Sequence, residues 1–244
     1  MKCVFLAAGY ATRLYPLTEN FPKPLLKVGD KPILDWLIDD MNQTGLIDEY
    51  IVISNHKFAS IFQQWAGQKS EKITVIDDGT TSNETRLGAV KDIQFAIESL
   101  HLDDDLLVMA GDNLLDFSLG GFIRYAKEKQ STCVMCYYEA DEARLHKTGV
   151  AEIDADGRIL SMEEKPAQPK SHWCVPAFYF YTREDARLIQ KGIESGCGTD
   201  APGSFIAWLC GQTRVYAWEM PGHRYDIGNL ESYEAVKRAF KTVL

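Results

Sequence analysis

The chain lacks the two commonest glycine-rich phosphate loops. After its first apolar run, Gly9 is followed by Tyr-Ala-Thr-Arg, with no second glycine and no Gly-Lys-Ser/Thr triplet. A Walker loop requires G-x-x-x-x-G-K-[ST], and a dinucleotide-binding loop requires G-x-G-x-x-G. Neither pattern fits, so this loop does not indicate a P-loop NTPase or a classical dinucleotide-binding protein.

The chain also lacks an excess of basic residues and any long apolar run. Its 244 residues include 26 Lys and Arg against 35 Asp and Glu, a formal net charge of −9. Binding to a nucleic-acid backbone needs clustered cations, so we expect no nucleic-acid partner. No run of about 18 apolar residues occurs, so we expect no membrane span or membrane partner. The start of the chain has no charged segment followed by a cleavage site, so we expect no secretory signal.

Paired metal-binding cysteines are missing as well. Of six cysteines, only Cys133 and Cys136 form a C-x-x-C, inside the segment STCVMCYY. That segment is typical of a strand, where positions three apart face opposite sides. A zinc site would need a second such pair. We therefore expect free core thiols in a reduced, cytoplasmic protein.

Apolar runs alternate with amphipathic segments in the first half of the chain. KCVFLAA, YIVISN and KITVIDD predict buried strands, and KPILDWLIDDMNQTG and KFASIFQQWAG predict helices between them. This alternation predicts a Rossmann-like α/β fold, in which helices flank a mostly parallel sheet and ligands bind at the carboxyl ends of strands. Ala8-Gly9, Asn55 and Asp77-Asp78 follow three strands, so we expect them along one edge.

The second half changes character. A helix over 122–130 and a strand over 132–140 precede a hairpin turning at Asp156-Gly157. After a proline-rich loop we expect a single aromatic strand over 175–181, a helix over 183–195 and a strand over 214–220. A loop over 221–229 leads to a final helix capped by Asn229. No linker or repeat interrupts the chain, so one domain with antiparallel elaborations fits best.

Three segments carry candidate binding residues. In the opening loop, small residues allow backbone N–H groups to approach a phosphate, and Arg13 and Lys23 supply neutralising charge. Gly88 opens a helix, either to relieve crowding or to let a nucleobase edge approach the main chain. Asp112 ends a strand in AGDN, as a turn residue or as a ligand of Mg²⁺. These alternatives stay open from the residues alone.

Taken together, these segments resemble the sugar-1-phosphate nucleotidylyltransferases, also called nucleotide-sugar pyrophosphorylases. The matching motifs are LAAGYATRLYPLT with PKPLL, LGA, AGDN, TGVAEID, EEKP and YDIGN, in the family's order. The resemblance implies a GT-A-like variant of the Rossmann-like fold. It also implies transfer of a nucleotidyl group from a nucleoside triphosphate to a sugar 1-phosphate, with Mg²⁺ as cofactor. An NDP-sugar and pyrophosphate would be the products, and a pyrimidine nucleotide, dTTP or UTP, the expected donor.

The resemblance implies a division of the single domain, residues 1–244. The nucleotide-binding part would run to about residue 130, the sugar-phosphate part over 131–228, and a closing helix over 229–244. In the first part, Arg13 would neutralise the departing pyrophosphate, and Lys23 would hold the α-phosphate and the incoming phosphate. The residues that frame the nucleotide would be Leu6, Ala8, Gly9, Thr12 and Gly88.

The metal and sugar residues come from later motifs. By resemblance, Asp112 and Asp226 are the paired Mg²⁺ ligands, and Asp112 is also catalytic with Arg13 and Lys23. Ordinary alternatives remain, since Asp226 could instead pair with Arg224 or cap a turn, and the lysines and Arg13 could be surface charges. The sugar phosphate would be contacted by Gly149, Glu164 and Lys165.

Several positions depart from the family pattern and bear on the substrate. The opening loop lacks a second glycine, Thr148 stands where a tyrosine is frequent, and Pro176-Ala177 replaces a glycine. The glutamine-proline element of many thymidylyl enzymes is also missing. These changes weaken an assignment to glucose 1-phosphate and dTTP. No hexapeptide repeat follows YDIGN, so an additional acyltransferase activity is not expected.

Two other functions stay open. A cytidylyltransferase acting on a phosphorylated amino alcohol or other small phosphate would share the opening loop, but TGVAEID and EEKP favour a sugar. A non-catalytic nucleotide-sugar sensor would be expected to lose the phosphate-binding cations or the metal carboxylates, and this chain keeps them. A homo-oligomer is also left open.

Overall fold

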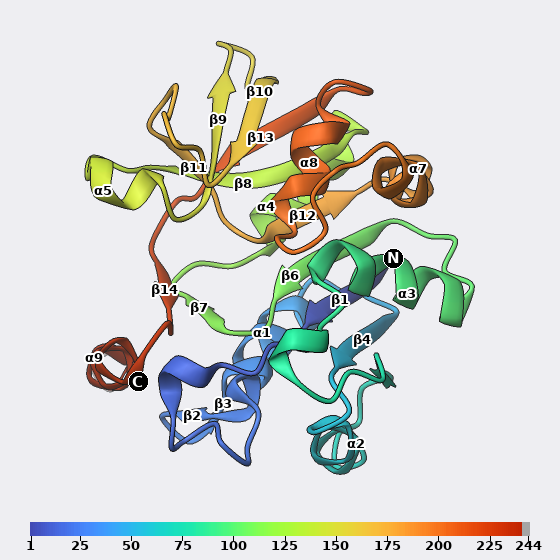
Figure 1. Ribbon diagram of the computed structural model, residues 1–244, viewed down its shortest axis with the longest axis vertical. Helices are drawn as coiled ribbons and strands as arrows, with labels where there is room; N and C mark the ends of the chain where they lie inside the picture. Colours follow the sequence, from blue (N-terminus) through green and yellow to red (C-terminus); the bar gives the residue numbers. More distant parts are fainter. Residues whose placement is uncertain (241–244) are drawn as a thin grey trace. The chain divides into compact units, whose positions relative to one another are not determined.

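The computed structural model describes residues 1–240, and the chain divides into two compact units (Figure 1). Unit 1 comprises residues 1–4, 87–109 and 121–220, and unit 2 comprises residues 5–86, 110–120 and the segment from 221 onward. Each unit is therefore assembled from segments that are distant in sequence. The boundary expected at about residue 130 separates two binding functions, not two compact units. It stays a prediction.

Unit 2 contains the parallel strands expected from the first half of the chain. Strand β4 (Glu49–Ser54) pairs in parallel with β5 (Ile73–Asp77), and helix α2 (Ala59–Ala66) connects them and packs on both. Helix α1 (Ile33–Asn42) begins directly after Pro32, whose missing N–H costs nothing at a helix start. Most of its apolar residues recur at helical spacing and are buried. These helices and strands confirm the predicted α/β alternation.

A short antiparallel ribbon in unit 2 was not predicted. Strand β7 (Asn113–Leu115) pairs with β14 (Arg224–Asp226), with Asp226 opposite Asn113. Strand β14 lies in the segment that we expected to be a loop, and β7 begins where we expected the preceding strand to end. Strands of three residues give too few positions for an alternating pattern to be recognised. Helix α9 (Leu230–Phe240) follows, and Asn229 caps it as predicted, because its Oδ1 accepts the Ser232 N–H at 2.8 Å.

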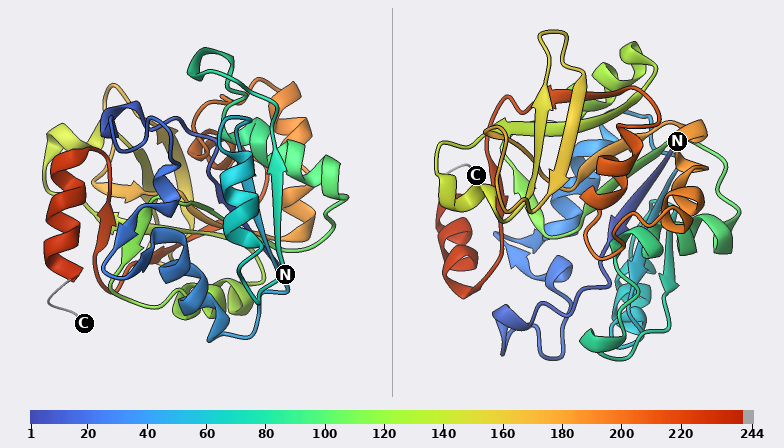
Figure 2. Two further views of the ribbon diagram at one scale, coloured as in Figure 1. Left: turned by 90° about the horizontal axis from the view of Figure 1, so that it is seen from below. Right: turned by 45° about the horizontal axis from the view of Figure 1, so that its top comes forward.

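The antiparallel strands of the main sheet belong to unit 1. Their order is β10 (Ile159–Glu164), β9 (Gly149–Ile153), β11 (Trp173–Val175), β8 (Thr132–Tyr138), β12 (Phe178–Tyr181) and β6 (Leu106–Ala110), and β13 (Val215–Glu219) pairs in parallel with β8. The predicted hairpin is confirmed: β9 (Gly149–Ile153) and β10 (Ile159–Glu164) are antiparallel and project as a two-stranded ribbon (Figure 2). Gly157 in its turn has φ 81°, a conformation that suits glycine. Parallel and antiparallel pairs together confirm the expected mixed α/β sheet with antiparallel elaborations.

The prediction of one aromatic strand over 175–181 is wrong. Pro176 and Ala177 separate β11 (Trp173–Val175) from β12 (Phe178–Tyr181). These two strands pair on opposite sides of β8, β11 beside β9 and β12 beside β6. Proline has no N–H for a sheet ladder, so the chain leaves one position in the sheet there and enters another.

The helix expected over 183–195 is also interrupted. It forms α6 (Arg183–Ala186) and α7 (Ile189–Glu194). The Leu188 N–H bonds to the Asp185 carbonyl only three residues back, which tightens the turn that separates the two helices. Residues 241–244 of the predicted closing helix lie outside the described residues.

The remaining elements are β1 (Lys2–Leu6), η1 (Thr12–Leu14), η2 (Lys23–Leu25), β2 (Lys27–Val28), β3 (Lys31–Pro32), η3 (Asn83–Thr85), α3 (Ala89–Leu100), β6 (Leu106–Ala110), α4 (Gly120–Lys129), β8 (Thr132–Tyr138), α5 (Glu142–Leu145), α8 (Gly203–Leu209) and β13 (Val215–Glu219).

The cysteines are free, as predicted. Cys133 and Cys136 are buried in β8, and burial raises the pKa of each thiol to about 12, so both stay protonated at neutral pH. Cys197 and Cys210 are only half-buried, so they are not core residues. Within residues 1–240, no group of three or more His, Cys, Asp or Glu side chains is arranged to hold a metal.

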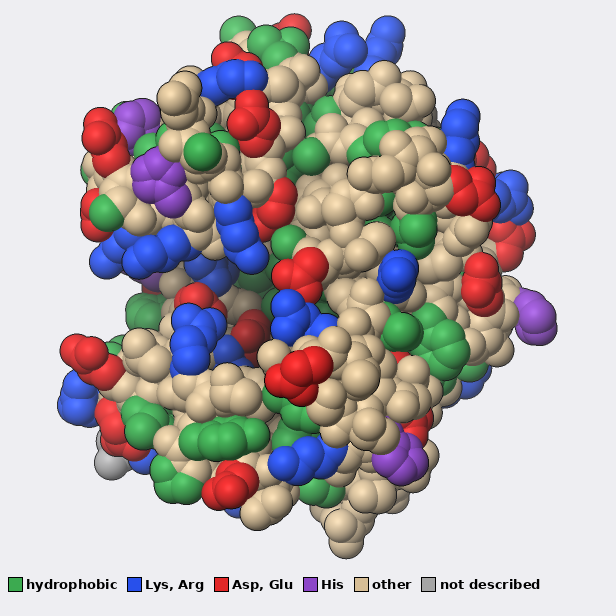
Figure 3. Space-filling view, viewed as in Figure 1, with side chains coloured by type: hydrophobic (Ala, Val, Ile, Leu, Met, Phe, Trp, Pro, Cys, Tyr) green, Lys and Arg blue, Asp and Glu red, His purple; other side chains and the backbone are tan. Residues whose placement is uncertain are grey.

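The surface in Figure 3 shows acidic and basic side chains interspersed, which agrees with a chain whose charge excess is negative but modest. Among residues 1–240, no helix has both the length and the apolar character needed to cross a bilayer.

Candidate active site

The opening loop in unit 2 starts where β1 ends. Ala7 donates its N–H to the Ile53 carbonyl of β4 at 3.0 Å, which fixes the end of the strand. Gly9 is exposed, and a Cβ placed on it would meet no described atom within 4 Å. Neither packing nor a left-handed backbone requires glycine here. The open space beside Gly9 is what a phosphate approaching the main chain would need.

The expected row of strand ends is confirmed. Asn55 is fully buried, and its Nδ2 donates to the Ala8 carbonyl at 2.9 Å while its Oδ1 accepts the Phe58 N–H at 3.1 Å. On the other side, the Asp78 N–H donates to the Ser54 carbonyl at 2.9 Å. Asn55 therefore braces the opening loop against the start of α2, a role that the sequence did not reveal.

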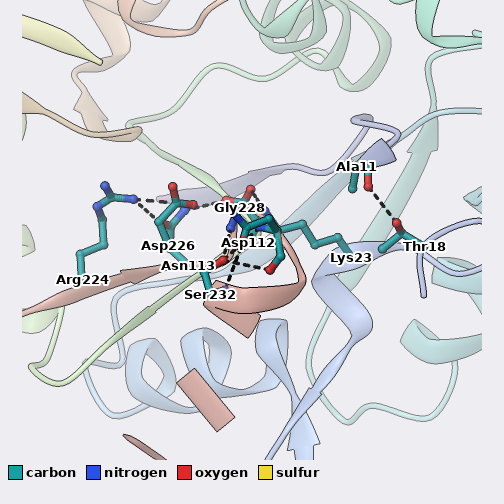
Figure 4. Close-up of polar contacts among 10 residues, drawn as sticks. Ala11, Thr18, Lys23, Asp112, Asn113, Arg224, Asp226, Gly228 and Ser232 are labelled. Carbon is teal, nitrogen blue, oxygen red and sulfur yellow. Dashed lines mark hydrogen bonds and ion pairs between the residues drawn. The ribbon is translucent and has the colours of Figure 1, made fainter. Parts of the chain in front are cut away.

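A side-chain hydrogen bond holds the backbone of the segment after Gly9. Ala11 has φ 47°, an uncommon left-handed conformation for a residue other than glycine. The buried Thr18 hydroxyl donates to the Ala11 carbonyl at 2.8 Å and supports that conformation (Figure 4). Thr12 and Arg13 follow in η1 and are exposed. The loop therefore presents the Arg13 guanidinium to solvent from a fixed backbone.

Lys23 is the buried cation of this loop. It lies between Pro22 and Pro24 in η2 and is only 8% exposed. Its Nζ lies 2.6 Å from Asp112 Oδ2. A buried ammonium is costly unless it is paired, so this contact with Asp112 is what makes the position tolerable. The structure thus joins the predicted phosphate-binding lysine to the predicted metal ligand.

The β7–β14 ribbon pairs the two segments that carry the predicted metal carboxylates. Asp112 immediately precedes β7, and Asp226 lies opposite Asn113. Figure 4 draws both side chains with their polar contacts. The side chain of Asp226 is 56% exposed, and its Oδ1 is 4.0 Å from Arg224 Nη1. A Cβ on Gly228 would be 3.9 Å from both Asp226 Oδ2 and Arg13 Nη1, so both side chains extend toward Gly228.

This donor set fits Mg²⁺. The ion is usually bound by one or two carboxylates together with water and substrate phosphates, not by a complete cage of protein ligands. Asp112 and Asp226 supply two such carboxylates, from paired segments of the ribbon. Their role as metal ligands stays a prediction.

In unit 1, Gly88 has an internal reason to be glycine. Its φ is 93°, and a Cβ would lie 2.5 Å from the Thr199 carbonyl oxygen. The next two N–H groups, of Ala89 and Val90, donate to the Asp200 and Thr199 carbonyls. Relief of crowding therefore accounts for this glycine, and the base-reading role predicted by resemblance stays a prediction.

Glu164 occupies a space formed by two glycines of unit 1. A Cβ on Gly149 would be 2.3 Å from Met162 Cε and 3.2 Å from Glu164 Oε2, and a Cβ on Gly203 would be 2.1 Å from Glu164 Oε2. Burial raises the pKa of Glu164, and the charge of Lys165 acts in the opposite direction. The structure therefore brings the predicted sugar residues Gly149 and Glu164 together and adds Gly203, which the sequence had not singled out.

Lys165 has an uncommon backbone conformation, with φ 47°. Its N–H donates to the Thr148 carbonyl at 3.1 Å, and the Thr148 hydroxyl donates to the Val175 carbonyl at 3.2 Å. Thr148 thus ties together the segments next to β9, β10 and β11. The Thr148 hydroxyl is therefore used inside the protein. Although Thr148 departs from the family pattern, its carbonyl holds the backbone of the exposed Lys165.

His223 is not arranged as a catalytic base. Its Nδ1 lies 3.0 Å from Asp116 Oδ2, its main-chain N–H donates to Asp116 Oδ1 at 2.7 Å, and its ring is exposed. Burial raises the pKa of Asp116, but the hydrogen bonds from His223 outweigh burial, and the pKa lies below its ordinary value. The pair fastens the β7–β14 ribbon.

Comparison with known proteins decides the family. The sequence profile described as "Nucleotidyl transferase" (NTP_transferase) matches residues 2–242. The chain belongs to the nucleotidyl transferase family. A family member from Mycolicibacterium smegmatis, a glucose-1-phosphate thymidylyltransferase, is 33% identical over 196 residues, covering 78% of this chain and 65% of the relative. The chain thus spans slightly less than two thirds of that relative.

Two other known proteins match over nearly their whole length. The UTP–glucose-1-phosphate uridylyltransferase AglF of Haloferax volcanii is 29% identical over 240 residues, covering 98% of this chain and 96% of the relative. The solved structure of a UDP-glucose pyrophosphorylase complexed with UDP-glucose superposes with a TM-score of 0.83 at 21% identity, covering 100% of this chain and 99% of that one. The sequence relatives confirm the predicted resemblance to sugar-1-phosphate nucleotidylyltransferases, and the structure confirms the fold.

Proposed function

We propose that this family member transfers a nucleotidyl group from a nucleoside triphosphate to a sugar 1-phosphate, releasing pyrophosphate. The observation that carries the proposal is the cluster in unit 2, where Lys23 pairs with Asp112 at 2.6 Å and Arg13 and Asp226 approach Gly228. Cations and carboxylates on one loop and ribbon suit a polyphosphate and a divalent cation.

The reaction explains why no catalytic base is needed. The second pKa of a phosphate monoester is about 6, so the attacking phosphate is already mostly a dianion at neutral pH. The protein has to hold two polyanions in line and neutralise their charge. In this proposal, Lys23 turns from Asp112 to the α-phosphate and Arg13 binds the leaving pyrophosphate. Asp112 and Asp226 would hold Mg²⁺, which supplies charge neutralisation at the phosphates when it is bound.

Unit 1 would supply the sugar-phosphate contacts. Glu164 accepts hydrogen bonds from sugar hydroxyls in this proposal, and the exposed Lys165 binds the phosphate. Support comes from the way Gly149 and Gly203 leave room for the Glu164 carboxylate, and from the held backbone of Lys165. We further propose a pyrimidine nucleotide, dTTP or UTP, because the relatives described above are named thymidylyl- and uridylyltransferases.

The test is pyrophosphate release over a matrix of nucleoside triphosphates and acceptor phosphates with Mg²⁺. The acceptors include glucose 1-phosphate, other sugar 1-phosphates and a phosphorylated amino alcohol. We expect release only with sugar 1-phosphates, and fastest with dTTP or UTP. Release only with CTP and the amino alcohol would overturn the sugar assignment, and no release from any pair would overturn catalysis. The same assay applied to Asp112→Asn tests the proposed metal ligand. Asp30→Asn, which changes an exposed carboxylate of unit 2, is the matched control.

A further inference from the structure

A chain of three polar contacts connects Arg224 to Lys23 through the Asp112 carboxylate. Arg224 Nη1 donates to Asn113 Oδ1 at 2.5 Å, and Asn113 Nδ2 donates to Asp112 Oδ1 at 2.6 Å (Figure 4). Lys23 Nζ donates to the other oxygen, Asp112 Oδ2, at 2.6 Å. Asn113 is only 4% exposed. The two oxygens of Asp112 are therefore held by different partners.

The chemistry of these groups permits only one orientation of the Asn113 amide. A guanidinium has donors and no acceptor, and an ionised carboxylate has acceptors and no donor. The amide oxygen must therefore face Arg224 and the amide nitrogen must face Asp112. A flipped amide would place two donors together at one end and two acceptors together at the other.

We propose that Asn113 and Arg224 are positioning residues that set the direction of the Asp112 carboxylate, with Arg224 acting through Asn113. The Asn113 amide holds Oδ1 of Asp112, so that Oδ2 of Asp112 faces Lys23 and the cation that the site would bind. This inference rests on the proposed function, in which Asp112 is a metal ligand. Groups that orient a metal ligand commonly change metal affinity by about 10- to 100-fold when they are removed.

The opposite effect is expected if Arg224 acts only through its charge. Arg224 lies 4.0 Å from Asp226 Oδ1, so its guanidinium lies beside the proposed cation site. Removing a nearby positive charge should strengthen the binding of a divalent cation. Removing a positioning residue should weaken it. The sign of the change therefore separates the two explanations.

The experiment titrates the full chain with Mn²⁺ and follows the free ion by electron paramagnetic resonance. The variants are Arg224→Met, Arg224→Lys, Asn113→Leu and the double variant Asn113→Leu/Arg224→Met. Arg214→Met, an exposed arginine of unit 1, is the matched control. We expect Arg224→Met to raise the Mn²⁺ Kd about 10-fold and Arg224→Lys to recover part of that loss. In the Asn113→Leu background, Arg224→Met should add little.

An unchanged or lower Mn²⁺ Kd in Arg224→Met, with an unchanged Tm, would overturn the proposal. Fully additive effects in the double variant would overturn action through Asn113. If Asn113→Leu does not fold, the comparison of Arg224→Met with Arg224→Lys still decides the sign. Wild-type protein that binds no Mn²⁺ also overturns the proposal, whereas predicted Mn²⁺ affinities without pyrophosphate release would overturn only the proposed function.

Discussion

Different interactions organise the candidate site residues of unit 2 and those of unit 1. In unit 2, charged and polar side chains bind one another directly, as Lys23 binds Asp112 and Arg224 binds Asn113. In unit 1, the Glu164 carboxylate fits where Gly149 and Gly203 have no side chains, and a main-chain hydrogen bond holds the neighbouring Lys165. The first region should therefore fail when charge is removed, and the second when atoms are added.

The largest effect is expected from the carboxylates of unit 2. Asp112→Asn and Asp226→Asn should each lower kcat by about 100-fold or more, because each removes a negative charge that would hold Mg²⁺, and the ion would neutralise the phosphates. Steady-state pyrophosphate release measures this effect, and Tm checks the fold. Unchanged release in either variant would remove that residue from the proposed metal pair.

Lys165 should have the next largest effect. Lys165→Ala should raise the KM for the sugar phosphate about 10-fold and leave the KM for the triphosphate nearly unchanged, because the exposed ammonium of unit 1 is assigned to only one substrate. Initial rates with each substrate varied in turn measure both constants. Equal increases in the two constants would contradict the assignment.

Added methyl groups test the steric half of the comparison. Gly203→Ala should weaken sugar-phosphate binding, because its Cβ would displace the Glu164 carboxylate, and should cost at most about 1 kcal/mol of stability, because the carboxylate is the end of a flexible side chain. Gly9→Ala should leave Tm unchanged and weaken triphosphate binding, since its Cβ meets no described atom within 4 Å. Thermal melts and KM values separate the two. A lowered Tm in Gly9→Ala would show that this glycine serves the fold.

The smallest effect concerns the ribbon. The folded-state pKa of Asp116 is lowered, so its pairing with His223 stabilises the protein above the unfolded-state pKa of about 3.9. That contribution should be lost as pH falls through the lowered folded-state pKa. Asp116→Asn should therefore cost up to about 1 kcal/mol near pH 6 and almost nothing near pH 2. Urea unfolding at the two pH values measures the difference, and an equal cost at both would contradict it.

The sequence predicted the part of the fold that repeats locally. Helices such as α1 and the β9–β10 hairpin follow from periodicity and turn chemistry within about 15 residues. The separate pairing of β11 and β12 could not be predicted from local patterns. Pro176 indicates a break in the strand, but it does not indicate which strand pairs with each half. Pairing partners depend on contacts that no local pattern encodes.

The site was predicted in the same uneven way. The motifs indicated Lys23, Asp112 and Glu164 because their residue types suit phosphate, metal and sugar. They did not indicate that Asn55, Asn113 and Gly203 each place another group. An asparagine that braces a loop and one in a turn have the same local sequence signal, so only the three-dimensional contacts distinguish them.

The β7–β14 ribbon also has a consequence for the order in which the protein is made. Arg224 and Asn113 are 111 residues apart, and closing a flexible loop of that length costs on the order of 4 kcal/mol in chain entropy. A nascent chain that has passed Asp112 but not Asp226 has only one of the two carboxylates. The growing polypeptide therefore cannot assemble the acidic pair before synthesis of the ribbon is complete, however early β4 and β5 fold.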